Sequence, residues 1–377
     1  MKSFAKLTIG FIATLWVALA SAQTTTPNAY VYVISNPSTN TCELRGYKAD
    51  ATGALTPLSG APLWRTTTKR LLALAHTAHW LFVSDQANIY SFSISSNGGL
   101  KFTSSVNAAK YYGFFGETGA NLVLDHTGST LYALAIDGSG DNEFQFFNKN
   151  STNGALSFIG SSGSTAVYSD LVFTGTNQFA YGLLCFLTDP VSYGFKRGAD
   201  GSLTRFNPVV PFPTNPDGRF CPVSTAANPT NNLAVAMYLD STTQRTGPVP
   251  PGWLAVYSVD ASGNLTTKST ATNMPRAGVG GVSAMVASAP GNLLAVAGEG
   301  GLQIFHFNGS NPITPYTGLL ATHSIQQILW DTHDHLYGIS PSSGRLYAFK
   351  ITTTGHKQAA GSPYSVPNPV AITVLSK

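Results

Sequence analysis

The feature that most constrains the fold of this chain is a unit that occurs seven times. The most visible part of the unit is a short turn followed by Gly-x-Leu, and most copies lie roughly 45–60 residues apart. Five well-preserved copies and two decayed ones occupy residues 50–55, 96–100, 152–156, 200–203, 260–265, 310–313 and 353–357. This period is typical of four-stranded propeller blades, whereas helical repeats would show apolar stripes with a 3.6-residue period.

Each unit contains an apolar segment, a turn, and a second segment rich in Leu, Tyr, Ala and Val. In the third unit these are residues 121–124, 125–129 and 130–134. A third segment, such as 253–258, alternates more clearly, and the Gly-x-Leu turn then precedes a fourth segment. Apolar and β-branched segments bounded by turn residues predict four strands in each unit.

The two ends of the chain complement each other. The first unit, residues 29–64, has no innermost strand before it, and the segment 370–375 has no outer strands after it. Joining them completes a seventh blade and removes exposed sheet edges. The sequence therefore predicts an all-β fold, a single seven-bladed β-propeller of four-stranded blades, closed by pairing of the C-terminal strand with the N-terminal blade.

The N-terminus has the pattern of a secretory signal. Lys2 and Lys6 precede an apolar run over residues 7–20, and Ala20-Ser21-Ala22 is a small-residue cleavage motif. The run is too short to span a bilayer comfortably. We expect a signal peptide over residues 1–22, a propeller over 23–377, a secreted or periplasmic location, and no membrane span after cleavage.

The low charge excludes two classes of partner. Only 10% of residues are charged, against roughly 25% in an average domain. Removing residues 1–22 takes two of the 21 lysines and arginines and none of the 17 acidic residues, which leaves a charge of +2. Such a balance gives no electrostatic footprint for nucleic acid or a membrane surface. We expect a monomer without a nucleic-acid partner.

Two stretches of the sequence resemble the lactonase-type seven-bladed propellers. They are residues 30–33, which read YVYV, and residues 47–62, which read YKADATGALTPLSGAP. That group includes bacterial 6-phosphogluconolactonases and muconate-cyclising enzymes, and the resemblance covers the whole chain after the leader. It implies a ligand site at the channel mouth, the end formed by the blade-to-blade loops and the second-to-third strand loops. In enzymes of the family, a His, an Arg and a Glu are expected near this mouth.

Three residues are candidates for catalysis at the mouth. Glu299 ends a second strand, where the family often has Asn-Glu in a different blade, and Arg276 lies in a preceding loop on the same face. Arg276 would polarise a carbonyl, and Glu299 or Asp170 would activate water. A solvated loop carboxylate is the alternative interpretation of Glu299. The six internal inner strands begin with neither His nor Arg, but with Leu71, Asn121, Asp170, Val223, Ala284 and Gln326.

Other residues on the mouth side are candidates for ligand binding. A loop that joins two blades carries aromatic side chains that would stack on a sugar or aromatic ligand, or else pack over the channel rim: Tyr111, Tyr112, Phe114 and Phe115. Arg245, in an insertion over residues 241–252, would form a wall of the site, unless this insertion is only a stiff surface loop. Asn121 and Gln326 begin inner strands at the mouth.

Histidine spacing raises the question of a metal site. His76 and His79, like His333 and His335, have spacings that zinc uses. The repeat alignment places these residues and His126 in or beside first-to-second strand turns, on the face opposite the mouth. It also gives His76 and His126 equivalent positions, which favours turn capping, so we expect no metal. No P-loop, dinucleotide fingerprint, calcium loop or Gly-x-Ser-x-Gly elbow occurs, and no cofactor is expected.

Three cysteines permit one disulfide. Cys185 closes the second strand of the fourth blade, and Cys221 opens the fifth blade on the same face. Cys42 lies about three blades away. In an exported chain this arrangement predicts a Cys185–Cys221 bridge and a free Cys42, with three reduced thiols as the alternative.

Three functions fit these observations. The first is a binding module whose mouth loops take a small molecule, a carbohydrate or an envelope protein; the low charge and the aromatic loop favour it. The second is a metal-independent lactone hydrolase or cyclase, which the family resemblance implies. A role in surface adhesion is the third.

Overall fold

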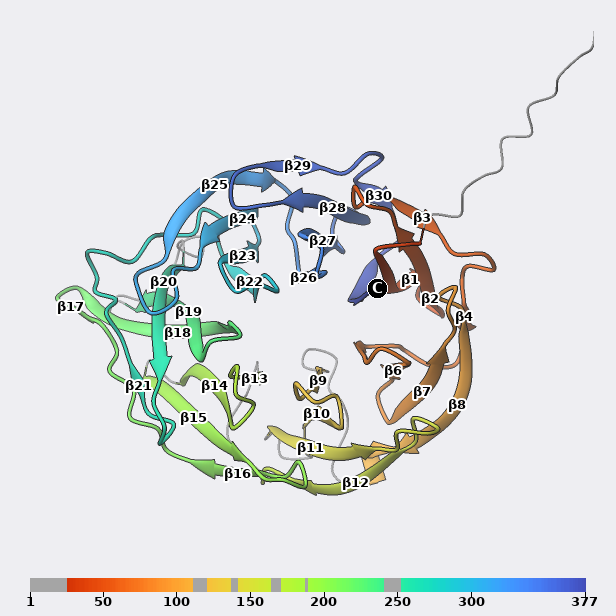
Figure 1. The fold of residues 1–377 in the computed structure, drawn as a ribbon, viewed down its shortest axis with the longest axis horizontal. Coiled ribbons are helices and arrows are strands. Elements are labelled where there is room, and N and C mark those ends of the chain that lie inside the picture. Colours follow the sequence, from red (N-terminus) through yellow and green to blue (C-terminus); the bar gives the residue numbers. More distant parts are fainter. Residues whose placement is uncertain (1–25, 111–120, 137–141, 164–170, 187–188, 241–251) are drawn as a thin grey trace, which may run out of the picture.

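The computed structural model of this chain describes residues 26–110, 121–136, 142–163, 171–186, 189–240 and 252–377. These residues form seven antiparallel sheets arranged in a ring around a central axis (Figure 1). The described chain contains one short 3-10 helix, η1 (Ala108–Lys110), and no helix long and apolar enough to cross a bilayer. The predicted seven-bladed propeller is therefore confirmed.

The first three blades, from the axis outward, have the strand orders β31-β1-β2-β3, β5-β6-β7-β8 and β9-β10-β11-β12, and β4 adds to β2. Their bounds are β31 (Pro369–Ser376), β1 (Ala29–Ser38), β2 (Thr41–Ala49), β3 (Leu55–Pro57), β4 (Trp64–Thr66), β5 (Ala73–His76), β6 (Trp80–Ser84), β7 (Asn88–Ile94), β8 (Leu100–Asn107), β9 (Leu122–Leu124), β10 (Thr130–Ile136), β11 (Asn142–Lys149) and β12 (Leu156–Ser161).

The other four blades follow the same plan, except that β17 adds to the start of β18 and β30 adds to β28. Their strands are β13 (Val172–Phe173), β14 (Phe179–Phe186), β15 (Asp189–Arg197), β16 (Leu203–Phe206), β17 (Thr214–Asn215), β18 (Gly218–Ala227), β19 (Asn232–Asp240), β20 (Trp253–Val259), β21 (Leu265–Thr266), β22 (Val282–Ala287), β23 (Leu293–Gly298), β24 (Gly301–His306), β25 (Thr314–Ala321), β26 (Gln327–Trp330), β27 (His335–Ser340), β28 (Arg345–Ile351), β29 (His356–Gln358) and β30 (Tyr364–Ser365).

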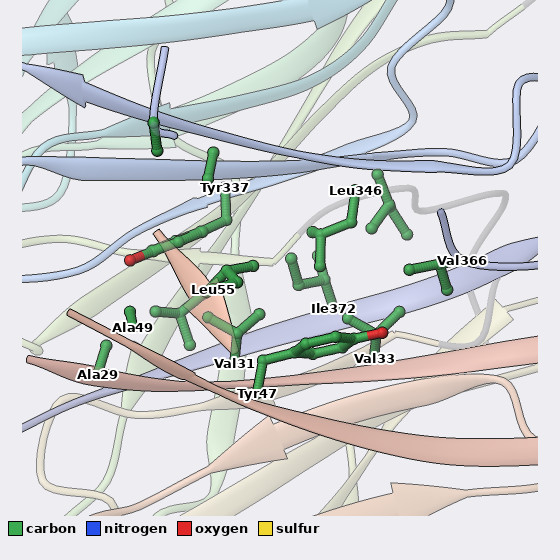
Figure 2. Close-up of a cluster of buried hydrophobic side chains, with 14 residues drawn as sticks. Ala29, Val31, Val33, Tyr47, Ala49, Leu55, Tyr337, Leu346, Val366 and Ile372 are labelled. Carbon is green, nitrogen blue, oxygen red and sulfur yellow. The ribbon is translucent and has the colours of Figure 1, made fainter. Parts of the chain in front are cut away.

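The C-terminal strand closes the ring. β31 pairs antiparallel with β1 from Ala29↔Ser376 to Ile34↔Ala371, so the last residues of the chain supply the innermost strand of the first blade. A buried cluster fills the space between this blade and the seventh, and Figure 2 shows Val31 and Ile372 facing Tyr337 and Leu346 within it. Ring closure thus rests on both backbone pairing and apolar packing, as the sequence predicted.

The glycines of the Gly-x-Leu turns have a specific packing role. Gly98, Gly154 and Gly201 have φ angles of 83°, 70° and 90°, in the left-handed region that glycine tolerates best. Each lies against an aromatic or polar residue of the second strand in the preceding blade. Tyr132 Oη donates to the carbonyl of Gly201 at 2.6 Å, and a Cβ on Gly154 would come within 2.4 Å of the Trp80 ring. The repeat therefore also encodes contacts between neighbouring blades.

Candidate functional site

A cavity of about 690 Å³ runs along the ring axis and is lined by the innermost strands of all seven blades. Figure 1 shows these strands around the central opening. Most lining side chains are apolar, and the polar ones that the structure describes are His76, Asn121, His126, Ser224, Thr225, Ser283, Gln326, Gln327 and Thr373. Among the described lining residues there is no Asp, Glu, Lys or Arg. The described part of the channel wall therefore presents hydrogen-bonding groups but no carboxylate, ammonium or guanidinium group.

Asn121 and Gln326 occupy the mouth end of this channel. Asn121 immediately precedes β9 and Gln326 immediately precedes β26, and both line the cavity. Within the described chain, neither side-chain amide has a hydrogen-bond partner, whereas the neighbouring Gln327 accepts a bond from the Ile372 amide at 3.1 Å. Ser283 likewise donates its hydroxyl to the Ile325 carbonyl, at 2.6 Å. Asn121 and Gln326 are thus the mouth amides with unused hydrogen-bonding capacity.

The structure does not bring Arg276 and Glu299 together as an ion pair. The Arg276 guanidinium lies over the Trp253 ring, 4.1 Å from its centroid, in a cation–π contact. Glu299 is exposed in the turn between β23 and β24 and has no salt bridge to any described residue. Neither residue lines the channel. Asp170, the third catalytic candidate, lies outside the described residues.

Five predicted ligand-binding residues also fall outside the described chain. They are four aromatic residues of one blade-to-blade loop and one arginine of the insertion in the fifth blade: Tyr111, Tyr112, Phe114, Phe115 and Arg245. Their proposed contacts with a ligand remain predictions.

Two histidines line the opposite end of the channel, which we call the base. The strand register corrects the expected equivalence of His76 and His126. His76 pairs with Leu81 as Leu124 pairs with Leu131, so His76 ends an inner strand at the level of Leu124, whereas His126 belongs to the following turn. Because His76 lines the cavity instead of capping a turn, the turn-capping interpretation is wrong for this residue. No cluster of three or more His, Cys, Asp and Glu side chains suited to a metal occurs in the described part of the chain.

The environment of His76 is unusual for a histidine facing a cavity. Its Nδ1 lies 2.7 Å from Thr373 Oγ1, on the neighbouring inner strand β31. Burial disfavours the charged ring and lowers the pKa of His76 to about 4. The ring is therefore neutral at ordinary pH.

Two charged clusters on the rim were not anticipated from the sequence. Glu43 accepts paired bonds from Arg45 and Arg65, with shortest N–O distances of 2.5 Å. Burial by itself would raise the pKa of Glu43, but hydrogen bonds from the two arginines outweigh burial and lower it. In the second blade, Tyr90 Oη donates to Asp85 at 2.6 Å while Lys69 contacts both groups.

The contacts in each cluster hold segments of the same blade together, and none of the residues involved lines the channel. The Lys69 contacts join the loop before β5 to the turn after β6, and the Glu43 contacts join β4 to β2. No short motif marks either cluster, because the partners are separated by turns and are ordinary residue types in the sequence.

The cysteines occupy strands near the rim. Cys221 is disulfide-bonded, and Cys42 is free and buried. Cys221 lies inside β18, opposite Tyr238, instead of in a blade-to-blade loop. Cys185 belongs to β14, and its side chain lies outside the described part of the structure. The Cys185–Cys221 pairing therefore stays a prediction.

Comparison with solved structures shows the same fold in lactonase-type propellers. The periplasmic gluconolactonase PpgL of Pseudomonas aeruginosa is 14% identical, with a TM-score of 0.63 over 92% of this chain and 99% of that one. A putative 6-phosphogluconolactonase from Bacteroides fragilis is 13% identical, with a TM-score of 0.57 over 94% and 99%. The fold is that of the lactonase-like propellers.

The same fold also occurs in a protein solved with a bound partner. Sqt1 of Chaetomium thermophilum, bound to the N-terminus of ribosomal protein L10, is 13% identical to this chain. Its TM-score is 0.53 over 89% of this chain and 85% of that one. No protein-family model and no curated protein sequence matches the chain. At these identities the likeness shows the architecture alone.

Proposed function

We propose that this protein is a binding module whose central channel takes a small, uncharged, polyhydroxylated ligand of the carbohydrate class at its mouth. The observation that carries the proposal is a cavity of about 690 Å³ whose described lining combines apolar side chains with a few uncharged polar groups. Asn121 and Gln326 each offer two N–H donors and a carbonyl acceptor, which is the pattern that sugar hydroxyls satisfy. Cavities of roughly 300–1,000 Å³ with a few convergent polar groups are typical of small-molecule sites.

The lining also argues for a neutral ligand. A buried charge without a counter-charge costs several kcal/mol, and the described lining offers no charged side chain to a phosphate or carboxylate. An uncharged sugar avoids that cost because its hydroxyls exchange bonds with water for bonds with amides and hydroxyls. Selectivity for neutral over anionic sugars is therefore expected.

Isothermal titration calorimetry with methyl β-D-glucoside and D-glucose 6-phosphate tests the proposal. The neutral glycoside should bind at least tenfold more tightly than the phosphate. Gln326→Ala and Asn121→Ala should each weaken binding of the neutral glycoside about fivefold, which corresponds to the loss of roughly one hydrogen bond. Gln86→Ala is the matched control, because Gln86 is exposed in the turn after β6 and does not line the cavity. Equal affinity for the phosphate, or no heat from the neutral sugar at millimolar concentration, contradicts the proposal.

Metal-independent lactone hydrolysis is the second candidate function. The fold shared with PpgL favours it, and Arg276, Glu299 and Asp170 are its candidate catalytic residues. A pH-stat assay with D-glucono-1,5-lactone measures this activity above the spontaneous rate. If the protein is a lactonase, Arg276→Ala and Glu299→Gln should lower kcat by at least tenfold without changing stability. A rate equal to the buffer blank rejects this candidate.

Export to the periplasm or medium completes the proposal. The leader pattern of residues 1–22 supports it, and it would place the channel among extracellular or envelope sugars. Mass spectrometry of the mature N-terminus tests it, with cleavage after Ala22 as the expected result.

A further inference from the structure

His76 gives the base of the channel a polar group that the mouth site does not use. Its ring lines the cavity, its Nδ1 is engaged by Thr373, and within the described chain its Nε2 has no hydrogen-bond partner. Thr373 comes from β31, the strand that closes the ring, so ring closure fixes the orientation of the imidazole. An oriented ring nitrogen without a partner, in the wall of a cavity, is suited to form a hydrogen bond with a ligand.

The chemistry of this ring favours recognition over catalysis. A general base works best when its pKa lies near the working pH, and His76, with a pKa of about 4, is far below neutrality. It would therefore be a weak acceptor for the Thr373 proton, and the pair is poorly suited to produce a nucleophile. A neutral imidazole still donates or accepts one hydrogen bond through Nε2, according to its tautomer.

The wall between mouth and base is mostly apolar, with Thr225 and Thr373 as the polar residues at intermediate levels. In the third blade the lining runs from Asn121 through Leu122 and Val123 to Leu124, which lies level with His76. A strand rises about 3.3 Å per residue, so the mouth amide and the His76 level are separated by roughly 10 Å along the axis. Side chains of other blades continue this apolar belt at intermediate and lower levels: Val172, Phe173, Met285, Val286, Ile328 and Leu329.

We propose that the base of the channel is a second recognition point, and that the ligand is an elongated neutral glycoside with an apolar or aromatic aglycone ending in a hydroxyl. The sugar would sit among the mouth amides, the aglycone would pack against the apolar belt, and the terminal hydroxyl would bond to His76 Nε2. A phenyl ring with its para oxygen covers part of this separation, and the sugar ring and the lining side chains at the two ends would cover the rest. The inference rests on the proposed binding function, since it extends the same channel site.

Calorimetry with three probes tests the inference: methyl, phenyl and 4-hydroxyphenyl β-D-glucoside. The phenyl group should improve affinity over methyl, and the para hydroxyl should add a further gain of about fivefold. In His76→Phe, which keeps a planar ring without the nitrogen, the hydroxyl gain should vanish while phenyl glucoside still binds. His79→Phe is the matched control, because His79 is exposed and does not line the cavity. Thr373→Val should reduce the hydroxyl gain without abolishing binding of the phenyl probe.

The outcomes separate the two proposals. If methyl glucoside binds but the para hydroxyl adds nothing to wild-type affinity, the base is not a recognition point and only this inference is wrong. A hydroxyl gain that survives in His76→Phe also overturns it. If none of the three glucosides binds, the proposed function fails and the inference fails with it.

Discussion

Protonation of His76 should make the folded protein less stable in mild acid. Burial lowers the pKa of His76 to about 4 in the folded state, whereas an unfolded histidine titrates near 6.5. Between these values the unfolded chain binds more protons, so the free energy of unfolding falls as pH drops from about 6.5 to 4 and then levels off for this group. The expected loss is on the order of 2–3 kcal/mol.

Urea unfolding at pH 7 and pH 4.5 measures this loss, with His76→Gln as the comparison. The variant should lose less stability than the wild type over this interval. Glu43 and Asp331 have lowered pKa values, so their contributions are lost mainly at more acidic pH and do not mimic the effect. An identical pH dependence in wild type and variant would show that His76 titrates normally.

Only part of the site at the residue scale could be predicted from the sequence. Position at the start of an inner strand identified Asn121 and Gln326, and both line the channel. The same alignment wrongly gave His76 and His126 equivalent positions, because an alignment of turn motifs does not show which residue forms the last strand pair before each turn. The Arg276–Trp253 stack also escaped prediction, since the partner of a long cationic side chain depends on tertiary packing.

At the scale of the repeated element, substitution of a Gly-x-Leu glycine should reveal the contact between blades. Gly154→Ala puts a non-glycine residue in the left-handed region, which costs about 1–2 kcal/mol. It also places a Cβ within 2.4 Å of the Trp80 ring. Gly60 has a similar φ of 79°, but a Cβ there would meet only open space, so Gly60→Ala isolates the backbone cost. We expect Gly154→Ala to exceed Gly60→Ala by about 1–3 kcal/mol in unfolding free energy, measured by chemical denaturation. Equal costs would mean that the blades relax apart without penalty.

The strands and turns were predictable because local signals agree with the tertiary fold. Apolar strands, turn glycines and the period of the unit all indicate the same four-stranded blade. The partners of the turns were not predictable. Tyr132 and Gly201 are 69 residues apart, and nothing in either segment specifies the other.

At the scale of the whole molecule, the C-terminal strand should be essential for stability. Deleting residues 370–377 removes almost all of β31, exposes the edge of β1 and opens the cluster around Ile372. Thermal unfolding should show a fall of roughly 10 °C or more, or no cooperative transition. Deletion of Lys377 alone is the control, because it leaves β31 intact. A truncated chain that melts at the wild-type temperature contradicts this closure.

The predicted Cys185–Cys221 bridge would join the fourth and fifth blades. Cys221 is disulfide-bonded and Cys42 is free, so a Cys221→Ser variant should lose the bridge and on the order of 3–4 kcal/mol of stability by loop-entropy arguments. Peptide mapping under non-reducing conditions identifies the partner. A crosslink that contains Cys42 would contradict the predicted pairing.

Because β31 is both the last segment of the chain and the innermost strand of the first blade, the order of synthesis matters for folding. The ribosome makes β1 first, yet its inner edge has no partner until β31 has emerged. During that interval the growing chain is an open arc with an unpaired edge, which is prone to pair with other chains. A premature stop, even very near the end, is therefore expected to yield an aggregating polypeptide in place of a slightly shorter working protein.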